Sequence, residues 1–250
     1  MTVSRDRLLD AFAQVLDPDA FDDYGPNGLQ VEGKPQIGKI VSGVTASAAF
    51  IDAAIAAGAD AIVVHHGLFW RGMDGTVTGW MKQRLQRLLA HDINVLAYHL
   101  PLDAHPEWGN NAQLGLHMGW GTGAPLREKS LVFRADLATP YANGQALADQ
   151  LQHRLGRTPI CIDAGRSIRT LAWCTGGAQG YFQKAIDAGV DAFVTGEISE
   201  PQAHLARECG VSFIAAGHHA TERYGMPALA GHIAGQLGLE HEFIEIDNPA

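Results

Sequence analysis

The sequence predicts an α/β protein with two similar lobes, each containing βαβ units and a mostly parallel sheet. Apolar strand-like segments alternate with amphipathic helix-like segments along the 250 residues, which is the pattern of parallel strands joined by crossover helices. The segment AGADAIVV at 57–64 returns as AGVDAFVT at 188–195, with the same order of elements before and after it. Hydrophobic residues make up 46% of the chain, enough to bury a large core.

The first lobe is expected over residues 1–124. It begins with a helix that has Ser4 as its N-cap and ends before Pro18, because a serine hydroxyl accepts from an N–H of the first turn and proline interrupts a helix. Three strands and two more helices follow in alternation. These are strands at 39–44, 61–64 and 94–98, an alanine-rich helix ending at Ala57, and a helix over 79–90 that presents Trp80, Leu85, Leu88 and Leu89.

The second lobe is expected over residues 125–250, packed closely against the first so that the two form one structural unit, with no extra domain inserted. The repeat predicts strands at 171–174 and 212–216, which correspond to the first and last strands of the first lobe. Three additional elements are expected near the start of this lobe. They are a strand at 131–133, a helix ending near Leu155 and a strand at 160–162.

Composition and charge exclude several classes of protein. Lys and Arg (18) are outnumbered by Asp and Glu (27), and the net charge of −9 is not offset by a basic run, so nucleic acid is not an expected partner. No apolar stretch is long enough for a transmembrane helix. The three cysteines are odd in number and far apart, which is typical of a reducing compartment, and we expect a cytoplasmic protein. The common phosphate-loop and serine-nucleophile motifs are absent.

Three strand ends carry residues that can bind metal. His65 and His66 directly follow the strand at 61–64, Asp103 follows the strand at 94–98, and a second His doublet begins at His218. Ligand sites of open α/β sheets gather at the carboxyl ends of the strands, so these residues are expected to share one rim.

The spacing of these residues favours two ions. Neighbours on an extended strand point to opposite sides, so His65 and His66 are expected to reach different ions. His218 and Glu222 are four residues apart and share a face if a helical turn begins at Gly217. Two divalent ions and two carboxylates leave net positive charge, which favours hydroxide and an anionic substrate.

The remaining histidines and neighbouring residues have less specific interpretations. His99, His105 and His219 either orient ligands or are only polar neighbours. Glu197 takes the place of His66 in the repeat, and its role stays open. Residues 69–71 (FWR) either line a pocket or belong to the core. Six histidines are expected to be structural: His91, His117, His153, His204, His232 and His241.

Five short motifs together resemble the GTP cyclohydrolase 1 type 2 homologue family, in particular its short bacterial members. They are NGLQV at 27–31, HHG at 65–67, HLPLD at 99–103, TGE at 195–197 and GHHATER at 217–223. The resemblance implies a ring-shaped homohexamer whose metal sites face an internal cavity. It also implies a dinuclear site formed by His65, His66, Asp103, His218 and Glu222.

The reaction remains open between several functions. The leading hypothesis is a metal-dependent hydrolase that opens the imidazole ring of GTP or a related purine nucleotide, with His99 moving protons. A phosphatase or another dinuclear hydrolase would use the same residues. A metal-delivery protein and an interaction scaffold, in which the site is not catalytic, are the alternatives of a different class. Zinc, iron, manganese, cobalt and nickel all suit three imidazoles and two carboxylates.

Overall fold

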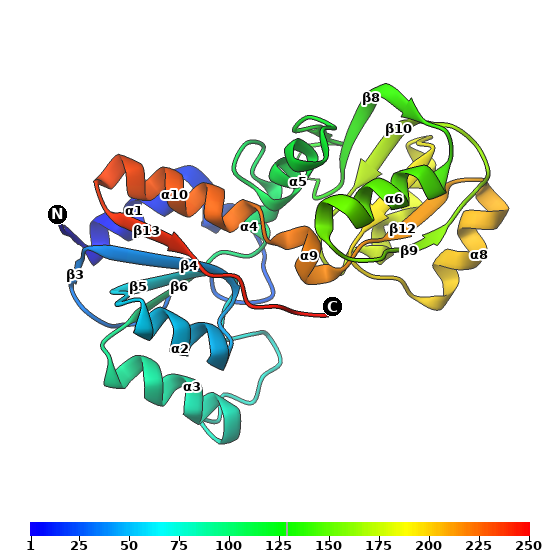
Figure 1. The fold of residues 1–250 in the computed structure, drawn as a ribbon. Helices are drawn as coiled ribbons and strands as arrows, with labels where there is room; N and C mark the ends of the chain where they lie inside the picture. Colours follow the sequence, from blue (N-terminus) through cyan, green and yellow to red (C-terminus); the bar gives the residue numbers. More distant parts are fainter. Residues whose placement is uncertain (129) are drawn as a thin grey trace. The chain divides into compact units, whose positions relative to one another are not determined.

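Parallel strands form the centre of each of two large sheets in the computed structural model, which describes residues 1–128 and 130–250 (Figure 1). The chain divides into two compact units, each containing one of these sheets. Unit 1 comprises Met1–Leu102 and Met226–Asp247, and unit 2 comprises Asp103–Gly225 and Asn248–Ala250. The predicted α/β class with two sheet-containing lobes is confirmed.

The bounds of these units differ from the expected division at residue 124. Helix α5 (Asn110–Met118) lies before that residue, yet its buried side chains pack into the core of unit 2. Strand β13 (Glu240–Phe243) lies near the end of the chain, yet it pairs in parallel with a strand of unit 1. The repeat marks the central strands of each sheet, whereas these two elements are placed by tertiary packing.

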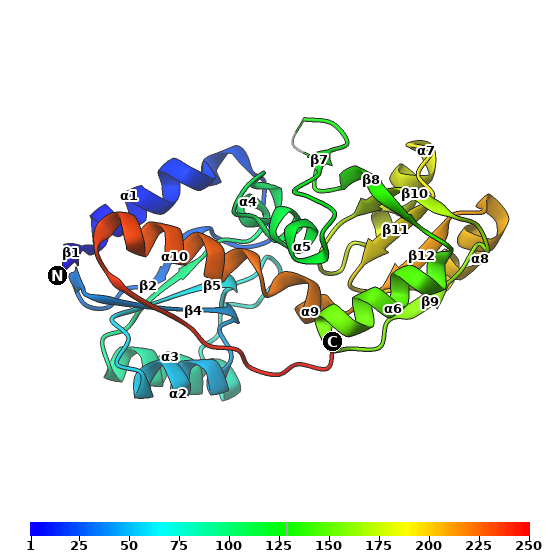
Figure 2. The same ribbon diagram turned by 45° about the horizontal axis from the view of Figure 1, so that its top comes forward.

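The sheet of unit 1 has the strand order β13-β4-β5-β6-β2, and only β2 runs antiparallel to its neighbour. Its remaining strands are β2 (Gly28–Val31), β4 (Lys39–Thr45), β5 (Ala61–His66) and β6 (Asn94–Ala97). Helices cover both faces, with α1 and α10 on one side and α2 and α3 on the other (Figures 1 and 2). These helices are α1 (Arg5–Leu16), α2 (Ala48–Ala56), α3 (Gly79–Ala90) and α10 (Gly225–Leu237). A small antiparallel pair, β1 (Val3–Ser4) and β3 (Gln36–Ile37), completes the unit.

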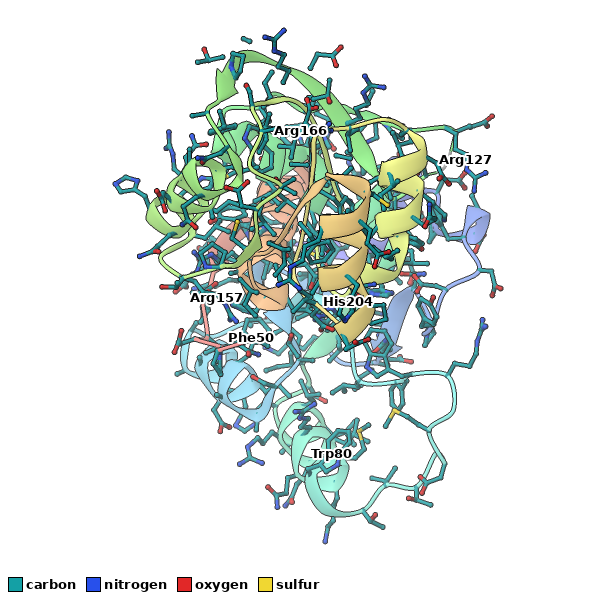
Figure 3. The ribbon with its side chains drawn as sticks, turned by 90° about the vertical axis from the view of Figure 1, so that its right-hand side faces the viewer. Phe50, Trp80, Arg127, Arg157, Arg166 and His204 are labelled. Carbon is teal, nitrogen blue, oxygen red and sulfur yellow. The ribbon has the colours of Figure 1, made fainter. Side chains whose placement is uncertain are left out.

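The helix starts of unit 1 follow the predicted capping. Ser4 accepts a hydrogen bond from the N–H of Arg7, and Ser47 caps α2 in the same way. The predicted face of α3 is confirmed in part: Leu88 is buried with Met81, Leu85 packs partly buried against the core, and Leu89 is exposed. Trp80, labelled on α3 in Figure 3, is 55% exposed. The helix therefore buries a narrower apolar stripe than the sequence pattern indicated.

The sheet of unit 2 has the strand order β7-β8-β10-β11-β12-β9. Its central strands β10, β11 and β12 are parallel, and the outer strands pair antiparallel. The strands are β7 (Ala124–Pro125), β8 (Phe133–Tyr141), β9 (Ile160–Ile162), β10 (Ile168–Trp173), β11 (Ala192–Thr195) and β12 (Ser212–Ala215). The strand expected at 131–133 is displaced to β8, because much of that strand is partly exposed and polar, so the apolar run marks only its start.

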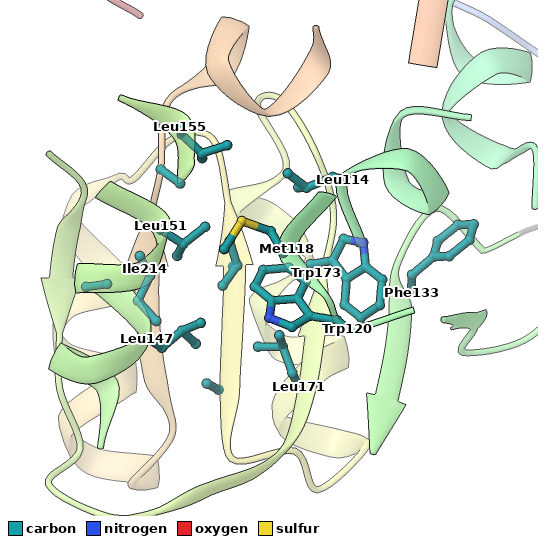
Figure 4. Packing of buried hydrophobic residues seen from close by; sticks show 14 of the residues in the cluster. Leu114, Met118, Trp120, Phe133, Leu147, Leu151, Leu155, Leu171, Trp173 and Ile214 are labelled. Atoms are coloured by element: carbon teal, nitrogen blue, oxygen red, sulfur yellow. The ribbon is translucent and has the colours of Figure 1, made fainter. Parts of the chain in front are cut away.

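Two hydrophobic layers cover the faces of this sheet. On one face, Leu147, Leu151 and Leu155, which lie four residues apart on one side of α6 (Gly144–Leu155), pack towards Trp173 and Ile214 (Figure 4). On the other face, Phe182 of α7 (Phe182–Asp187) contacts Phe193 and Phe213 of the sheet. Helix α8 (Glu200–Cys209) belongs to this second layer through Ala206. Among the described residues of both units, no helix is long and apolar enough to cross a membrane.

The repeat seen in the sequence has a structural counterpart in strand register. Ala61 of β5 lies opposite Ile40, and Ala192 of β11 lies opposite Leu171. The aspartate before each of these strands holds the start of the neighbouring strand. Asp60 accepts from the N–H groups of residues 38 and 39, and Asp191 accepts from those of residues 169 and 170. Both units therefore place equivalent strand ends at one edge of a parallel sheet.

Candidate metal centre

Three imidazoles gather at the carboxyl ends of β5 and β6 in unit 1. His65 and His66 are the last residues of β5, and His99 follows β6 by two positions. One ring nitrogen of each lies within 4.8 Å of those of the other two, a spacing that can hold a metal ion. We call His65, His66 and His99 the histidine cluster. The sequence predicted the first two as ligands and His99 as a catalytic residue.

Each imidazole of the histidine cluster uses Nδ1 to bind the protein. His65 Nδ1 lies 3.1 Å from the carbonyl oxygen of Tyr98, and His99 Nδ1 lies 2.6 Å from a carboxylate oxygen of Asp23. These oxygens only accept, so the rings donate there, and a neutral ring then carries its lone pair on Nε2. His66 Nδ1 lies 3.1 Å from the Thr45 hydroxyl, which can donate or accept. Nε2 is thus the atom that His65 and His99 can offer to a metal ion or a hydrogen-bond donor.

The NGLQV and HHG motifs hold this cluster together. Asn27 accepts from the backbone N–H of His99 at 2.8 Å and donates to Asp23 at 2.9 Å. Gln30 accepts from the N–H of Leu68 just after the doublet. A Cβ on Gly67 would lie 2.3 Å from the Gln30 side chain, so only glycine leaves room for this contact. The sequence motifs are therefore explained by packing around the imidazoles.

Aromatic rings border the histidine cluster. The Trp70 ring lies perpendicular to His99 with centroids 5.1 Å apart, and it is 5.9 Å from the ring of His66. Tyr24 meets His99 edge-on at 6.0 Å. Phe69 instead packs against the core of unit 1. Of the residues 69–71, only Trp70 lies beside the imidazoles.

A second group of candidate ligands lies at the carboxyl end of β12 in unit 2. Helix α9 (His218–Glu222) follows this strand, and its one turn places His218 Nε2 3.2 Å from a carboxylate oxygen of Glu222. Asp103, on α4 (Leu100–Ala104), offers a carboxylate oxygen within 4.8 Å of one from Glu222. Asp103, His218 and Glu222 form the unit 2 cluster. The expected i, i+4 pairing of His218 and Glu222 is present.

Buried polar contacts fix the two carboxylates of the unit 2 cluster. Asp103 accepts from the side chain of Asn110 at 2.9 Å and is 7% exposed. Glu222 is 3% exposed, and the backbone of Gly176 lies directly against it. A Cβ on Gly176 would come within 2.0 Å of Glu222 Oε1. Gly176 thus forms a cradle for this carboxylate, with φ of +70°.

Glu197, whose role the sequence left open, binds the outer nitrogen of His218. Its Oε1 accepts from His218 Nδ1 at 2.6 Å, which leaves the Nε2 side of the ring facing Glu222. Burial lowers the pKa of His218, but the carboxylates of Glu222 and Glu197 outweigh it and raise the pKa to about 9. A carboxylate bound to the remote nitrogen is the usual support of a metal-binding imidazole.

The other histidines have mostly structural contacts. His105 Nδ1 accepts from the N–H groups of Glu107 and Trp108, so this ring closes a turn. His241 binds the hydroxyl of Ser42 within unit 1. His219 is buried in α9, and its backbone N–H donates to the carbonyl of Ala250. Sequence reasoning missed Asp23, whose only signal was its place in a turn-rich loop.

The donor atoms of both clusters fit divalent transition metals. Imidazole nitrogens and carboxylate oxygens bind zinc, iron, manganese, cobalt and nickel, whereas calcium and magnesium favour oxygen alone. The imidazole orientations and the cradle around Glu222 hold these donors in place. Candidate ligands are thus present in each unit, and the three imidazoles of unit 1 form a group that could hold a metal ion.

Comparisons with known proteins find relatives that match nearly the whole chain. A family model described as Duf34/NIF3 (NGG1p interacting factor 3) matches residues 3–249. A Pseudomonas aeruginosa protein named GTP cyclohydrolase 1 type 2 homolog is 51% identical over 253 residues, covering all of both chains. A solved structure of a protein described as ybgI, of unknown function, has a TM-score of 0.95 and 47% identity, covering 99% of this chain and 100% of its own. A solved structure from Thermus thermophilus has a TM-score of 0.90 and 34% identity with the same coverage.

Proposed function

The chain belongs to the Duf34/NIF3 family, and from this membership and its clusters of imidazoles and carboxylates we propose that it is a dinuclear metal-dependent hydrolase. One observation carries the proposal. His65 and His218, two of the proposed ligands, each donate Nδ1 to a fixed oxygen, so each ring presents Nε2 in a defined direction. Structural histidines do not need this shared tautomer, whereas metal-binding imidazoles do.

We assign five ligands to two ions. His65 and Asp103 would hold one ion, His66 and His218 would hold the other, and Glu222 would bridge them. The two histidines are neighbours on β5 and the pleat of a strand directs neighbours to opposite sides, which supports separate ions. Glu222 has two oxygens and lies near both Asp103 and His218, which supports the bridge. Asp103 follows His99 by only four residues, so chain connectivity keeps it near β6.

The residues of the chain supply binding, charge balance and proton transfer. Paired divalent ions would supply a nucleophilic oxygen at neutral pH and stabilise negative charge on the attacked group. Asp103 and Glu222 return two negative charges, which leaves the centre positive and suited to an anionic substrate. His99, bordered by Trp70, is the group that moves protons.

The substrate class we propose is a purine nucleotide. In the reaction that the relatives' name suggests, one water adds to C8 of GTP and the C8–N9 bond breaks, which opens the imidazole ring to a formamide on N7; a second water hydrolyses this formamide and releases formate. Trp70 and Tyr24 give the histidine cluster an aromatic border, which suits a planar base. We also propose that the protein is a cytoplasmic homohexamer, as the resemblance implies.

Other functions would use the same clusters. A phosphatase or another dinuclear hydrolase would need only an anionic substrate in place of the purine. A protein that delivers metal, or a ring-shaped scaffold stabilised by metal, would bind the ions without turnover.

Two measurements test the proposal. Elemental analysis of purified protein should return about two transition-metal ions per chain. Protein loaded with that metal should then turn over at least one member of a panel of purine nucleotides and phosphate esters. Metal content without turnover, together with transfer of metal to a metal-free acceptor protein, would instead identify a delivery protein.

A further inference from the structure

Asp23 is a buried carboxylate of unit 1 that no part of the sequence pattern assigned. Its side chain is 1% exposed, and four groups donate to it. Oδ1 accepts from the N–H of Tyr24 at 2.6 Å and from His99 Nδ1 at 2.6 Å. Oδ2 accepts from the Asn27 side chain at 2.9 Å and from the N–H of Leu100 at 2.8 Å. A carboxylate with two oxygens and about four lone-pair sites is thereby filled with donors.

Because donors occupy both of its oxygens, the side chain of Asp23 is a deprotonated carboxylate. Burial raises the pKa of Asp23, but the hydrogen bonds from His99 and Asn27, together with the attraction to His99, outweigh it and lower the pKa to about 2. Since the carboxylate only accepts, the proton of the 2.6 Å contact belongs to Nδ1 of His99. The neutral ring must then carry its lone pair on Nε2.

The loop that contains Asp23 and Asn27 also fixes the orientation of the His99 ring. Asn27 accepts from the backbone N–H of His99 at 2.8 Å while it donates to Asp23, so ring and backbone are held by adjoining side chains. Trp70 and Tyr24 contact the ring from outside. The ring centroid lies 4.9 Å from that of His65 and 5.7 Å from that of His66. His99 therefore has one tautomer and one direction, towards the doublet.

We propose that Asp23 is a positioning residue that holds His99 in the Nδ1–H tautomer and so presents a hydrogen-bond acceptor, Nε2, to the ligand at the histidine cluster. The inference rests on the proposed function, in which His65 and His66 bind metal and His99 does not. The ligand it selects is one that brings an O–H or N–H to this position, such as a water molecule or the ring N–H of a heterocycle. With its proton on Nε2 instead, His99 would present an N–H donor to the O–H or N–H of the ligand, and the two donors would repel each other.

Neutron diffraction of the perdeuterated, zinc-loaded protein tests the tautomer directly. Crystals are grown well above the ordinary imidazole pKa of about 6.5. Deuterium should lie on Nδ1 of His99 and be absent from Nε2 and from Asp23. Deuterium on Nε2 would overturn the inference, and this result requires no variant and no activity.

Asp23→Asn tests whether Asp23 imposes the tautomer, with Asp22→Asn as its matched control. Asp22 is an exposed neighbour that pairs with Arg71. In Asp23→Asn, His99 should rotate or gain deuterium on Nε2, while zinc content per chain stays that of the wild type. An unchanged His99, or a loss of zinc, would overturn the inference, the latter because it would make the pair part of the metal site.

Kinetics separate this inference from the proposed function. If GTP is turned over, Asp23→Asn should lower kcat by about tenfold or more and change KM little. Added to His99→Gln, the same change should have no further effect, because Asp23 acts through His99. A further loss in the double variant would overturn the inference. Absence of turnover in the wild type would refute the hydrolase, and the neutron result would still decide the tautomer.

Discussion

Replacing Gly176 by alanine should remove metal from the protein while leaving the fold intact. The new Cβ would lie 2.0 Å from Glu222 Oε1, whereas real Cβ contacts stay beyond 3.0 Å. The carboxylate must therefore move by about 1 Å, and metal sites tolerate distance changes of only about 0.2 Å. In the proposed centre, Glu222 would then leave the range of about 2.0–2.2 Å at which a carboxylate oxygen binds zinc. We expect metal affinity to fall by at least about 10–100-fold.

Gly165→Ala is the matched control for backbone strain. Gly165 has φ of +71°, close to the +70° of Gly176, and a Cβ there would meet nothing within 4 Å. Both substitutions carry the left-handed penalty of about 1–2 kcal/mol. For a chain of this size each kcal/mol lowers the melting temperature by roughly 2–4 °C. The control should show this shift alone.

The assay compares the two variants with the wild type. Metal-free protein is titrated with zinc against a chromophoric chelator, and melting is followed with and without zinc. Gly165→Ala should bind zinc as the wild type does, and Gly176→Ala should lose most of the stabilisation that zinc gives. Equal zinc affinity in the two variants would refute the role of Glu222 as a ligand and of Gly176 as its cradle.

The remaining predictions concern charge, pH and assembly. Glu222→Gln should lose at least one ion per chain and any hydrolysis yet stay folded, whereas His241→Gln should keep its metal, as elemental mass spectrometry would show. In metal-free protein, protonated His218 stabilises the fold below its ordinary pKa of 6.5, and this stabilisation is lost as the pH rises through about 9. Urea unfolding should show that decline, and Glu197→Gln should reduce it. Light scattering at micromolar concentration should give six chains; one or two would contradict the ring. Binding to a random DNA duplex at about 150 mM salt should be weak, and nanomolar retention would contradict the charge argument.

Much of the fold was predictable because its signals are local. Ser4 and Ser47 cap helices through their own side chains, and the apolar runs of β4, β5 and β6 are buried on both faces. The outer strands were less predictable. Strand β8 is partly exposed and polar, and β13 joins β4 only through contacts between residues far apart in the chain. Periodicity does not carry that information.

The candidate site shows the same division between local and long-range information. The helical turn that joins His218 to Glu222 follows from spacing alone. The carboxylates that hold imidazoles do not: Asp23 lies 76 residues before His99, and Glu197 lies 21 residues before His218. In the sequence, Glu197 could have been noticed only as a carboxylate at a strand end. Asp23 could have been noticed only as a carboxylate in a turn-rich loop.

The two carboxylates that contact imidazole Nδ1 atoms, Asp23 and Glu197, come from different kinds of element, and the repeat shows how they differ. Glu197 stands just after β11 at the position that His66 takes at the end of β5, so the same strand end provides a proposed ligand in unit 1 and a hydrogen-bond partner of His218 in unit 2. In unit 1 that position holds an imidazole, and the carboxylate that contacts His99 is Asp23, from the loop before β2. Equal distances of 2.6 Å in both pairs arise from elements that the repeat does not relate. The two units thus place His99 and His218 after equivalent strands, β6 and β12, while carboxylates from elements that do not correspond hold the two rings.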